Sequence, residues 1–208
     1  MGWERKGEKQ VFHDRVYNDV MVDIETLSTE KDAVVLSIGA VRFRMDSIDD
    51  EDSLNEPGRC FYGRLDEWDQ EAMGRDIDTS TMKWWKKQDK EARAVFDEEA
   101  EPVTTVLDNF TNFCVGAKRM WGNGNTFDNV IIKDLYQDYG KEYPVNYWND
   151  LDMRTLTYLW NFVTNWESKG KRPDVIMGTS HNALDDAKRQ VVQSQRMIRK
   201  LKGSKYES

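Results

Sequence analysis

The sequence predicts an α/β protein in which a mixed β-sheet is flanked by α-helices. The first half of the chain contains three segments typical of strands: 18–25 and 33–43, which are apolar and rich in β-branched residues, and 59–64, which contains Phe61 and Tyr62. The second half alternates shorter strand-like segments with helices whose apolar residues recur every three or four positions. Such an order is typical of a sheet that helices cover. A length of 208 residues with 38% hydrophobic content suits one domain with a sizeable core.

Composition and charge limit the partners and the compartment. A formal net charge of −8 excludes a uniformly basic surface for nucleic acid. The apolar runs are too short for a membrane span, and the polar N-terminus lacks the hydrophobic segment of a secretory signal. We therefore expect a cytoplasmic protein with no membrane partner, divided into an N-terminal extension at 1–18 and one functional domain at 19–208.

The functional prediction depends on the stretch 19–28. An apolar strand that contains Val20, Val22 and Ile24 also carries Asp23 and Glu25, and side chains two apart on a strand share a face. Like charges at this spacing repel, so a cation is expected between them. From these residues alone, the alternative is a strand that ends in a solvated acidic turn.

Residues 33–43 and 59–64 predict an antiparallel pair of strands beside the first one. The connection between them, 46–56, is rich in acids. Its spacing lacks the glycine and the terminal glutamate of an EF-hand, so we expect a solvated loop and not a calcium site.

Residues 79–96 predict a helical region with a break near Asp89. Trp84 and Trp85 lie about 100° apart on such a helix, so one is expected to pack in the core while the other lines a surface. After Pro102, which is well placed for a helix start, 103–114 predicts a helix with a continuous apolar stripe and a structural role.

A strand at 118–122, a Gly/Asn turn and a helix at 130–139 follow, which is the arrangement of a ligand-facing edge in α/β domains. Asp128 at that helix start is either a cap or a functional carboxylate. A strand at 147–150 and a helix at 151–166 come next. The loop after them has basic residues, which either contact phosphates or are solvated: Lys169, Lys171 and Arg172.

The last helix is predicted to open at 179 and to extend towards 201. Its apolar stripe consists of Leu184, Ala187, Val191 and Ile198. At about 100° per residue, Asp186 lies about 110° from the centre of that stripe and Asp185 about 150° from it. Asp186 is therefore expected to flank the packed face, and Asp185 to point outward.

Three short motifs now carry a resemblance. They are Asp23-Ile-Glu25-Thr26, Asn125-Thr-Phe127-Asp128, and His181 followed five residues later by Asp186. The chain resembles the DEDDh group of the DnaQ-like, RNase H-like superfamily, and within it the DexA-type phage 3′-to-5′ exonucleases and their bacterial exoribonuclease relatives. Two further stretches look like that branch, Thr81-x-x-Trp84-Trp85 and Trp148-Asn-Asp-x-Asp152-x-Arg154.

The resemblance implies an RNase H-like fold and a metal-dependent 3′-to-5′ exonuclease. Two divalent cations, Mg²⁺ or Mn²⁺, suit hard oxygen ligands and the hydrolysis of a phosphodiester. By resemblance, Asp23 bridges both ions, and Glu25 and Asp186 hold the ion on the nucleophile side. Asp128 supports the other ion through water, and His181 takes the proton of the attacking water, a role that suits a neutral imidazole. For His181 by itself, the alternative is a capping or surface histidine.

The implied substrate is nucleic acid with a free 3′ end, with single-stranded DNA favoured over RNA. The expected substrate contacts are Thr26, Leu27, Trp84, Trp85, Asn125, Phe127 and Arg154. Either tryptophan can stack a base or pack in the core, and Arg154 can bind phosphate or pair with Asp152. Two alternatives stay open, namely an exoribonuclease acting on RNA or 3′ overhangs and a non-catalytic end-binding module or complex subunit. We also expect that the chain can form a homodimer.

Overall fold

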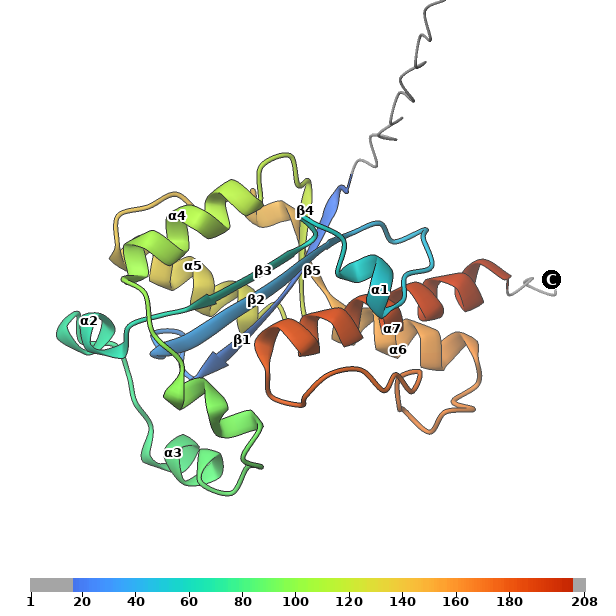
Figure 1. Cartoon of the computed structure of the whole chain (residues 1–208). Coiled ribbons are helices and arrows are strands. Elements are labelled where there is room, and N and C mark those ends of the chain that lie inside the picture. The colour runs from blue at the N-terminus through green and yellow to red at the C-terminus, as the bar shows by residue number, and fades with distance from the viewer. Residues whose placement is uncertain (1–16, 204–208) are drawn as a thin grey trace, which may run out of the picture.

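The computed structural model describes residues 17–203. Its centre is a five-stranded sheet in the order β3-β2-β1-β4-β5, with helices on both faces (Figure 1). The strands are β1 (Asp19–Thr26), β2 (Val35–Phe43), β3 (Cys60–Arg64), β4 (Arg119–Gly122) and β5 (Asp150–Asp152). The α-helices are α1 (Glu51–Leu54), α2 (Glu67–Ala72), α3 (Thr79–Trp85), α4 (Val103–Phe113), α5 (Asp128–Asp138), α6 (Met153–Val163) and α7 (Ala183–Gly203). The predicted α/β class, a mixed sheet flanked by helices, is confirmed.

The predicted N-terminal extension at 1–18 lies almost wholly outside the described residues, so its boundary with the domain stays a prediction. Within residues 17–203, none of the helices has the length and apolar character that crossing a membrane requires.

The directions of the strands decide where their ends meet. β1 pairs antiparallel with β2, and β2 pairs antiparallel with β3, as predicted. β1 pairs parallel with β4, and β4 pairs parallel with β5. The carboxyl ends of β1, β4 and β5 therefore lie at one edge of the sheet, which is where α/β proteins usually bind ligands.

The two faces of the central strand β1 contact different layers. Val20 and Val22 belong to the core cluster that includes residues of α4 and α5, while Met21 packs with residues of α6 and α7. Because side chains alternate along a strand, Asp23 and Glu25 share the Met21 face and point towards α7. Burial of both faces explains the continuous apolar run of this strand.

A smaller core cluster fastens α3 to the end of β1. Trp85 is buried, and its Nε1 donates a hydrogen bond to the carbonyl oxygen of Thr26 at 2.8 Å. Trp84 is 41% exposed. The prediction that one tryptophan packs and the other lines a surface is therefore confirmed. The predicted break near Asp89 is confirmed as well, because a separate 3₁₀ helix follows at Ala92–Asp97.

The prediction of a solvated acidic loop at 46–56 is wrong for one of its acids. Asp49 is 8% exposed and accepts hydrogen bonds from Nη1 and Nη2 of Arg59 at 3.0 and 2.9 Å. Gln195 of α7 also donates to Asp49, at 2.7 Å. A buried carboxylate requires such partners, and these partners come from distant parts of the chain. The segment therefore anchors the second half of α7.

The predicted strand at 147–150 and the start of the following helix are also misplaced. Tyr147–Asn149 forms a 3₁₀ turn with an exposed tyrosine ring, and the strand is Asp150–Asp152. α6 begins after it, because the Asp152 carboxylate accepts a hydrogen bond from the backbone N–H of Thr155 at 2.9 Å and so caps the helix.

The last helix begins four residues later than the predicted start at 179. His181 has a φ of 61°, in the left-handed region that an α-helix does not use. The side chain of Asn182 then accepts a hydrogen bond from the backbone N–H of Asp185 at 3.1 Å. α7 therefore starts at Ala183, and His181 lies in the turn before it.

A close approach between the sheet and α7 occurs at Gly39 of β2, which pairs with Asp23 of β1. A Cβ atom on Gly39 would lie 2.1 Å from the backbone nitrogen of Leu184 and 2.2 Å from the carbonyl carbon of Ala183. The first turn of α7 can lie against the sheet here because Gly39 has no side chain.

We expect Gly39→Ala to lower the free energy of unfolding by at least the about 1 to 3 kcal/mol typical of overpacking, because the obstructing atoms are backbone. Urea unfolding measures this loss. Gly203→Ala in α7 is the control, since a Cβ at Gly203 meets nothing within 4 Å. Equal stability of Gly39→Ala and the wild-type chain would contradict the expected packing.

Candidate active site

The five residues predicted to be catalytic come together from three parts of the chain. Asp23 and Glu25 lie in β1, Asp128 begins α5, and Asp186 lies in the first turn of α7, which starts beside β1 (Figure 1). Glu25, His181 and Asp186 each offer a possible metal-ligand atom, and these atoms all lie within 4.8 Å of one another. The carboxyl edge of the sheet and the start of α7 thus form one cluster that could hold a cation.

Asp128 faces β1 and does not cap α5. The N-cap position of α5 is Phe127, which makes no side-chain cap, and Asp128 is 3% exposed. A Cβ on Gly122, the last residue of β4, would lie 3.2 Å from the Asp128 side chain. Backbone N–H groups near Ile24 favour the ionised carboxylate and act to lower its pKa. Asp128 is therefore a buried carboxylate beside β1.

Burial and mutual repulsion raise the pKa values of three carboxyl groups. Burial raises the pKa of Glu25 to about 8, and the charge of Asp128 contributes to this rise. Burial raises the pKa of Asp128 to about 7. The pKa of Asp23 lies well above its usual range, first through burial and then through the charges of Asp128 and Glu25. The cluster therefore binds protons near neutral pH unless cations neutralise it.

His181 is held beside Asp186 by backbone and ring contacts. Its backbone N–H donates to Oδ2 of Asp186 at 2.9 Å. Its ring lies edge-to-face on Trp84, with the ring centroids 4.9 Å apart and the planes at 86°. Burial, and then the charge of Arg189, lower the pKa of His181 below its usual value. A neutral imidazole able to accept a proton therefore predominates at neutral pH.

Two polar residues of α7 belong to this cluster and were missed in the sequence. Arg189 forms an ion pair with Asp186 and donates to the carbonyl oxygen of Thr179 at 3.1 Å. Gln190 donates from Nε2 to Oδ1 of Asp23 at 2.7 Å. The signal that could have identified them is their spacing, because residues three and four positions after Asp186 lie on the same helix face.

Asp185 does not point outward into solvent as predicted. Its Oδ2 accepts a hydrogen bond from the backbone N–H of Thr179 at 2.8 Å, so the carboxylate folds back onto the turn that leads to His181. Asp185 therefore shapes the turn before α7, while Asp186 faces Glu25.

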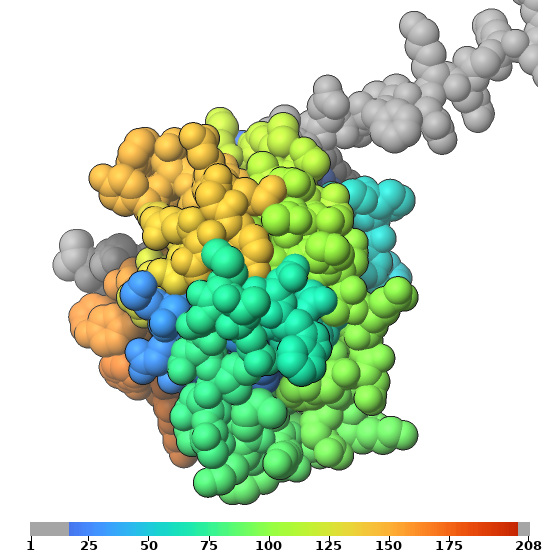
Figure 2. Space-filling model, turned by 90° about the vertical axis from the view of Figure 1, so that its left-hand side faces the viewer, coloured from blue at the N-terminus to red at the C-terminus, as the bar shows by residue number. Residues whose placement is uncertain are grey.

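A pocket of about 400 Å³ opens beside the carboxylates, between the end of β1 and α3. Figure 2 shows the segment after β1 (blue) next to the green segment that contains α3. The pocket is lined by Glu25 and by four of the predicted substrate contacts: Thr26, Trp84, Trp85 and Phe127. The structure thus places these four side chains around one cavity at the carboxylate cluster.

The other three predicted contacts lie elsewhere. Leu27 is buried in the core cluster beneath α3, and its backbone groups bond to Val34 and Asp78, so the structure does not place it in the pocket. Asn125 lies in the turn after β4, where its N–H donates to Asp152 at 3.3 Å.

Arg154 lies beside the turn after β4, and its guanidinium carbon would be 3.0 Å from a Cβ on Gly124. Burial raises the pKa of Asp128, and the positive charge of Arg154 opposes part of this rise. The carboxylate of Asp152 is occupied in capping α6. Asp152 therefore serves as the cap of α6, and phosphate binding by Arg154 stays a prediction.

Comparison with known proteins places the chain in a family. A model of the Rv2179c-like 3′-5′ exoribonuclease domain family matches residues 18–197. An exodeoxyribonuclease of Enterobacteria phage T4 is 26% identical over 161 residues, which cover 66% of this chain and 69% of that protein. The X-ray structure of the RNase domain of the yeast Pop2 protein superposes with a TM-score of 0.50 at 10% identity, over 89% of this chain and 78% of that one, which shows a shared fold. The chain therefore belongs to the Rv2179c-like 3′-5′ exoribonuclease domain family and is a 3′-5′ exonuclease of the DnaQ-like, RNase H-like class.

Proposed function

We propose that this exonuclease uses two divalent cations to remove nucleotides from the 3′ end of single-stranded DNA. The proposed catalytic residues are Asp23, Glu25, Asp128, His181 and Asp186. The observation that carries the proposal is the convergence of Glu25, His181 and Asp186 within 4.8 Å, next to the buried Asp128. A cytoplasmic location and a homodimer stay predictions.

The donor set fits Mg²⁺ or Mn²⁺. Carboxylate oxygens are the hard ligands that these ions prefer. Burial raises the pKa values of Glu25 and Asp128, and the charges of Arg189 and Arg154 offset this rise only in part, so a bound cation would favour the ionised carboxylates. We assign Asp23, Glu25, Asp128 and Asp186 as the ligands. When bound, the two ions would lower the pKa of an attacking water and neutralise charge on the phosphate.

His181 and Arg189 would have roles other than metal binding. His181 would accept the proton of the attacking water, because its imidazole is neutral and its orientation is set by Trp84 and by the bond from its backbone to Asp186. Arg189 would hold Asp186 in place through their ion pair.

The pocket beside Glu25 suits the terminal nucleotide. The half-exposed ring of Trp84 offers a stacking surface, which is worth about 1 to 3 kcal/mol per base. The buried Trp85 and its hydrogen bond to Thr26 form the inner wall. A strand end seated there would place its last phosphodiester at the carboxylates.

Sugar choice depends on groups that can bond a 2′-hydroxyl. The hydroxyl groups of Thr26 and Thr81 line the pocket but donate their protons within the protein, to Ser28 at 2.6 Å and to Asp78 at 3.0 Å. These two protons are therefore not available to a 2′-hydroxyl, and the proposed preference for DNA requires that Thr29, which also lines the pocket, makes no bond to one. The alternative substrate is RNA, which the description of the family favours.

Excess Mn²⁺ should raise the free energy of unfolding of EDTA-treated protein by about 2.7 kcal/mol at 100 times the dissociation constant, and the unfolding midpoint should rise with it. Differential scanning calorimetry measures the shift, which Asp186→Asn should abolish and Asp185→Asn should largely retain. A full shift in Asp186→Asn would contradict the ligand assignment.

In EDTA the stability should decrease from pH 5 to 8. The pKa of Glu25 is about 8 in the folded chain against 4.5 normally, so its protonated form stabilises the fold at low pH and this contribution is lost as the pH rises through 8. Urea unfolding of wild type and Glu25→Gln checks this, and the same slope in both would contradict it.

His181→Ala should lower the turnover rate by about 10² to 10⁴, the usual contribution of a positioned general base, while the Mn²⁺ shift survives. The wild-type rate should fall at acidic pH, below the ordinary histidine pKa, because burial lowers the pKa of His181 and the protonated ring cannot accept a proton. Single-turnover rates across pH measure both effects. The exposed neighbour variant Ser180→Ala is the control, and a near-normal rate in His181→Ala would reduce His181 to a structural role.

Labelled DNA should be shortened stepwise from its 3′ end in Mg²⁺, with matched RNA degraded at a lower or comparable rate. Gel analysis of both strands, with free and blocked 3′ ends, tests polarity and sugar together, and Asp23→Asn shows that the activity belongs to this site. Ladders on RNA alone would refute the DNA proposal.

A further inference from the structure

Beyond the active site, α6 exposes an aromatic stripe. Tyr158 and Phe162 on α6 and Trp166 just after it are 56%, 62% and 47% exposed. They follow Arg154 at four-residue intervals, the spacing that places side chains on one side of a helix. The ring centroid of Tyr158 lies 6.4 Å from that of Phe162 and 5.9 Å from that of Trp166. The opposite side of α6 packs against α7, so the stripe is a surface feature.

The loop after α6 returns along the helix towards the carboxylates. Oδ1 of Asn161 accepts a hydrogen bond from the backbone N–H of Gly170 at 3.2 Å, which holds the loop against the helix. Arg172 then donates to Asn123 in the turn after β4. The loop therefore runs from the far end of α6 back to the active site.

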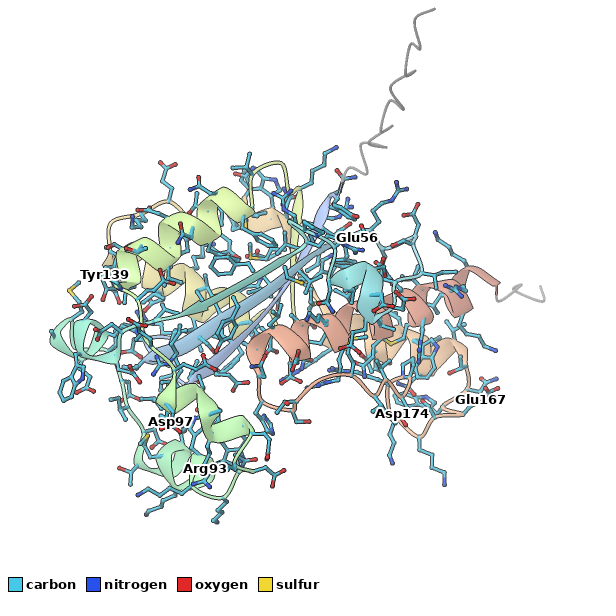
Figure 3. The ribbon with its side chains drawn as sticks, viewed as in Figure 1. Glu56, Arg93, Asp97, Tyr139, Glu167 and Asp174 are labelled. Atoms are coloured by element: carbon cyan, nitrogen blue, oxygen red, sulfur yellow. The ribbon has the colours of Figure 1, made fainter. Side chains whose placement is uncertain are left out.

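This loop adds positive charge along the stripe. Residues 153–172 contain four basic side chains and one acid, although the whole chain has a net charge of −8. The acid, Glu167, lies at the end of α6 that is far from α3 (Figure 3). The exposed Lys169 and Lys171 flank the first anchor point of the loop, Gly170, and Lys171 directly precedes the second, Arg172. Aromatic rings bordered by basic groups are the combination that binds single-stranded nucleic acid.

The stripe begins at the active site. Arg154 lies one helical turn before Tyr158 on the same side of α6, and its positive charge opposes part of the rise in the pKa of Asp128. From Arg154 to Phe162 the helix rises about 12 Å, the length of about 3 or 4 stacked nucleotides.

We propose that the part of the substrate strand on the 5′ side of the cleaved bond lies along α6. Its bases stack on Tyr158, Phe162 and Trp166, and its phosphates lie near Lys169 and Lys171. This inference rests on the proposed function, because it requires a strand whose 3′ end is held at the carboxylates. The concentration of positive charge on this side favours nucleic acid over a second protein as the occupant.

The test is a substrate-length series in Mg²⁺, with single strands of two to about 15 nucleotides. The double variant Phe162→Ala/Trp166→Ala should lose about 10- to 100-fold in kcat/KM on long strands, because two stacking surfaces are removed. The loss should disappear on the dinucleotide, which ends before Phe162. Phe162→Tyr/Trp166→Phe should retain activity on long strands, since both rings remain. Trp68→Ala, a 78% exposed tryptophan on α2 across the molecule, is the matched control.

The outcomes separate this inference from the function on which it rests. A loss of equal size at every length, or no loss on long strands, overturns the strand path along α6. A wild-type dimer that the double variant converts to monomers in sedimentation overturns it too, because the stripe would then be a protein interface. A wild-type chain that cleaves no single strand of any length refutes the proposed function itself.

Discussion

The electrostatic cost of burying several carboxylates at one sheet edge is the constraint on which the rest of the site depends. Besides burial, the charge of Asp128 raises the pKa of Asp23 and of Glu25, and Glu25 raises that of Asp23, because Coulomb repulsion is strong where water is scarce. Within the chain, compensation comes from the Gln190 hydrogen bond to Asp23 and from the charge of Arg189 on Asp23 and Glu25. These groups lower the repulsion without removing it, so the cations of the proposed function would neutralise charge that the chain itself leaves uncompensated.

The topology brings these charges together by ordinary packing. The parallel pairing of β1 and β4 places the start of α5, and with it Asp128, beside the end of β1. Gly39 allows the first turn of α7 to touch the sheet, which brings Asp186 to the same edge. The left-handed turn at His181 then directs its ring to Trp84. A site assembled from three elements thus depends on a glycine at position 39 and on the left-handed φ angle of His181.

The carboxylates lie between two surfaces of different character. On the α3 side is a pocket with a buried tryptophan as its inner wall, and on the α6 side is an open stripe of rings with basic neighbours. In the proposed function, an enclosed site for one nucleotide next to an open path accounts for removal of residues from a strand end. The overall charge of −8 is compatible with this, because residues 153–172, along which the strand would lie, carry four basic side chains and one acid.

The sequence by itself determined the succession of the strands and of most helices along the chain, and which residues form the acidic cluster. Local periodicity and short motifs carry this information, because alternation along β1 puts Asp23 and Glu25 on one face whatever surrounds it. Only the tertiary structure decided which side chains pair with the buried acids and where the last helix begins. The pairing of Asp49 with Arg59 and Gln195, the contact of Arg189 with Asp186 and the late start of α7 depend on groups that approach through folding. Burial and charge compensation are properties of that three-dimensional neighbourhood, and no pattern along the chain specifies them.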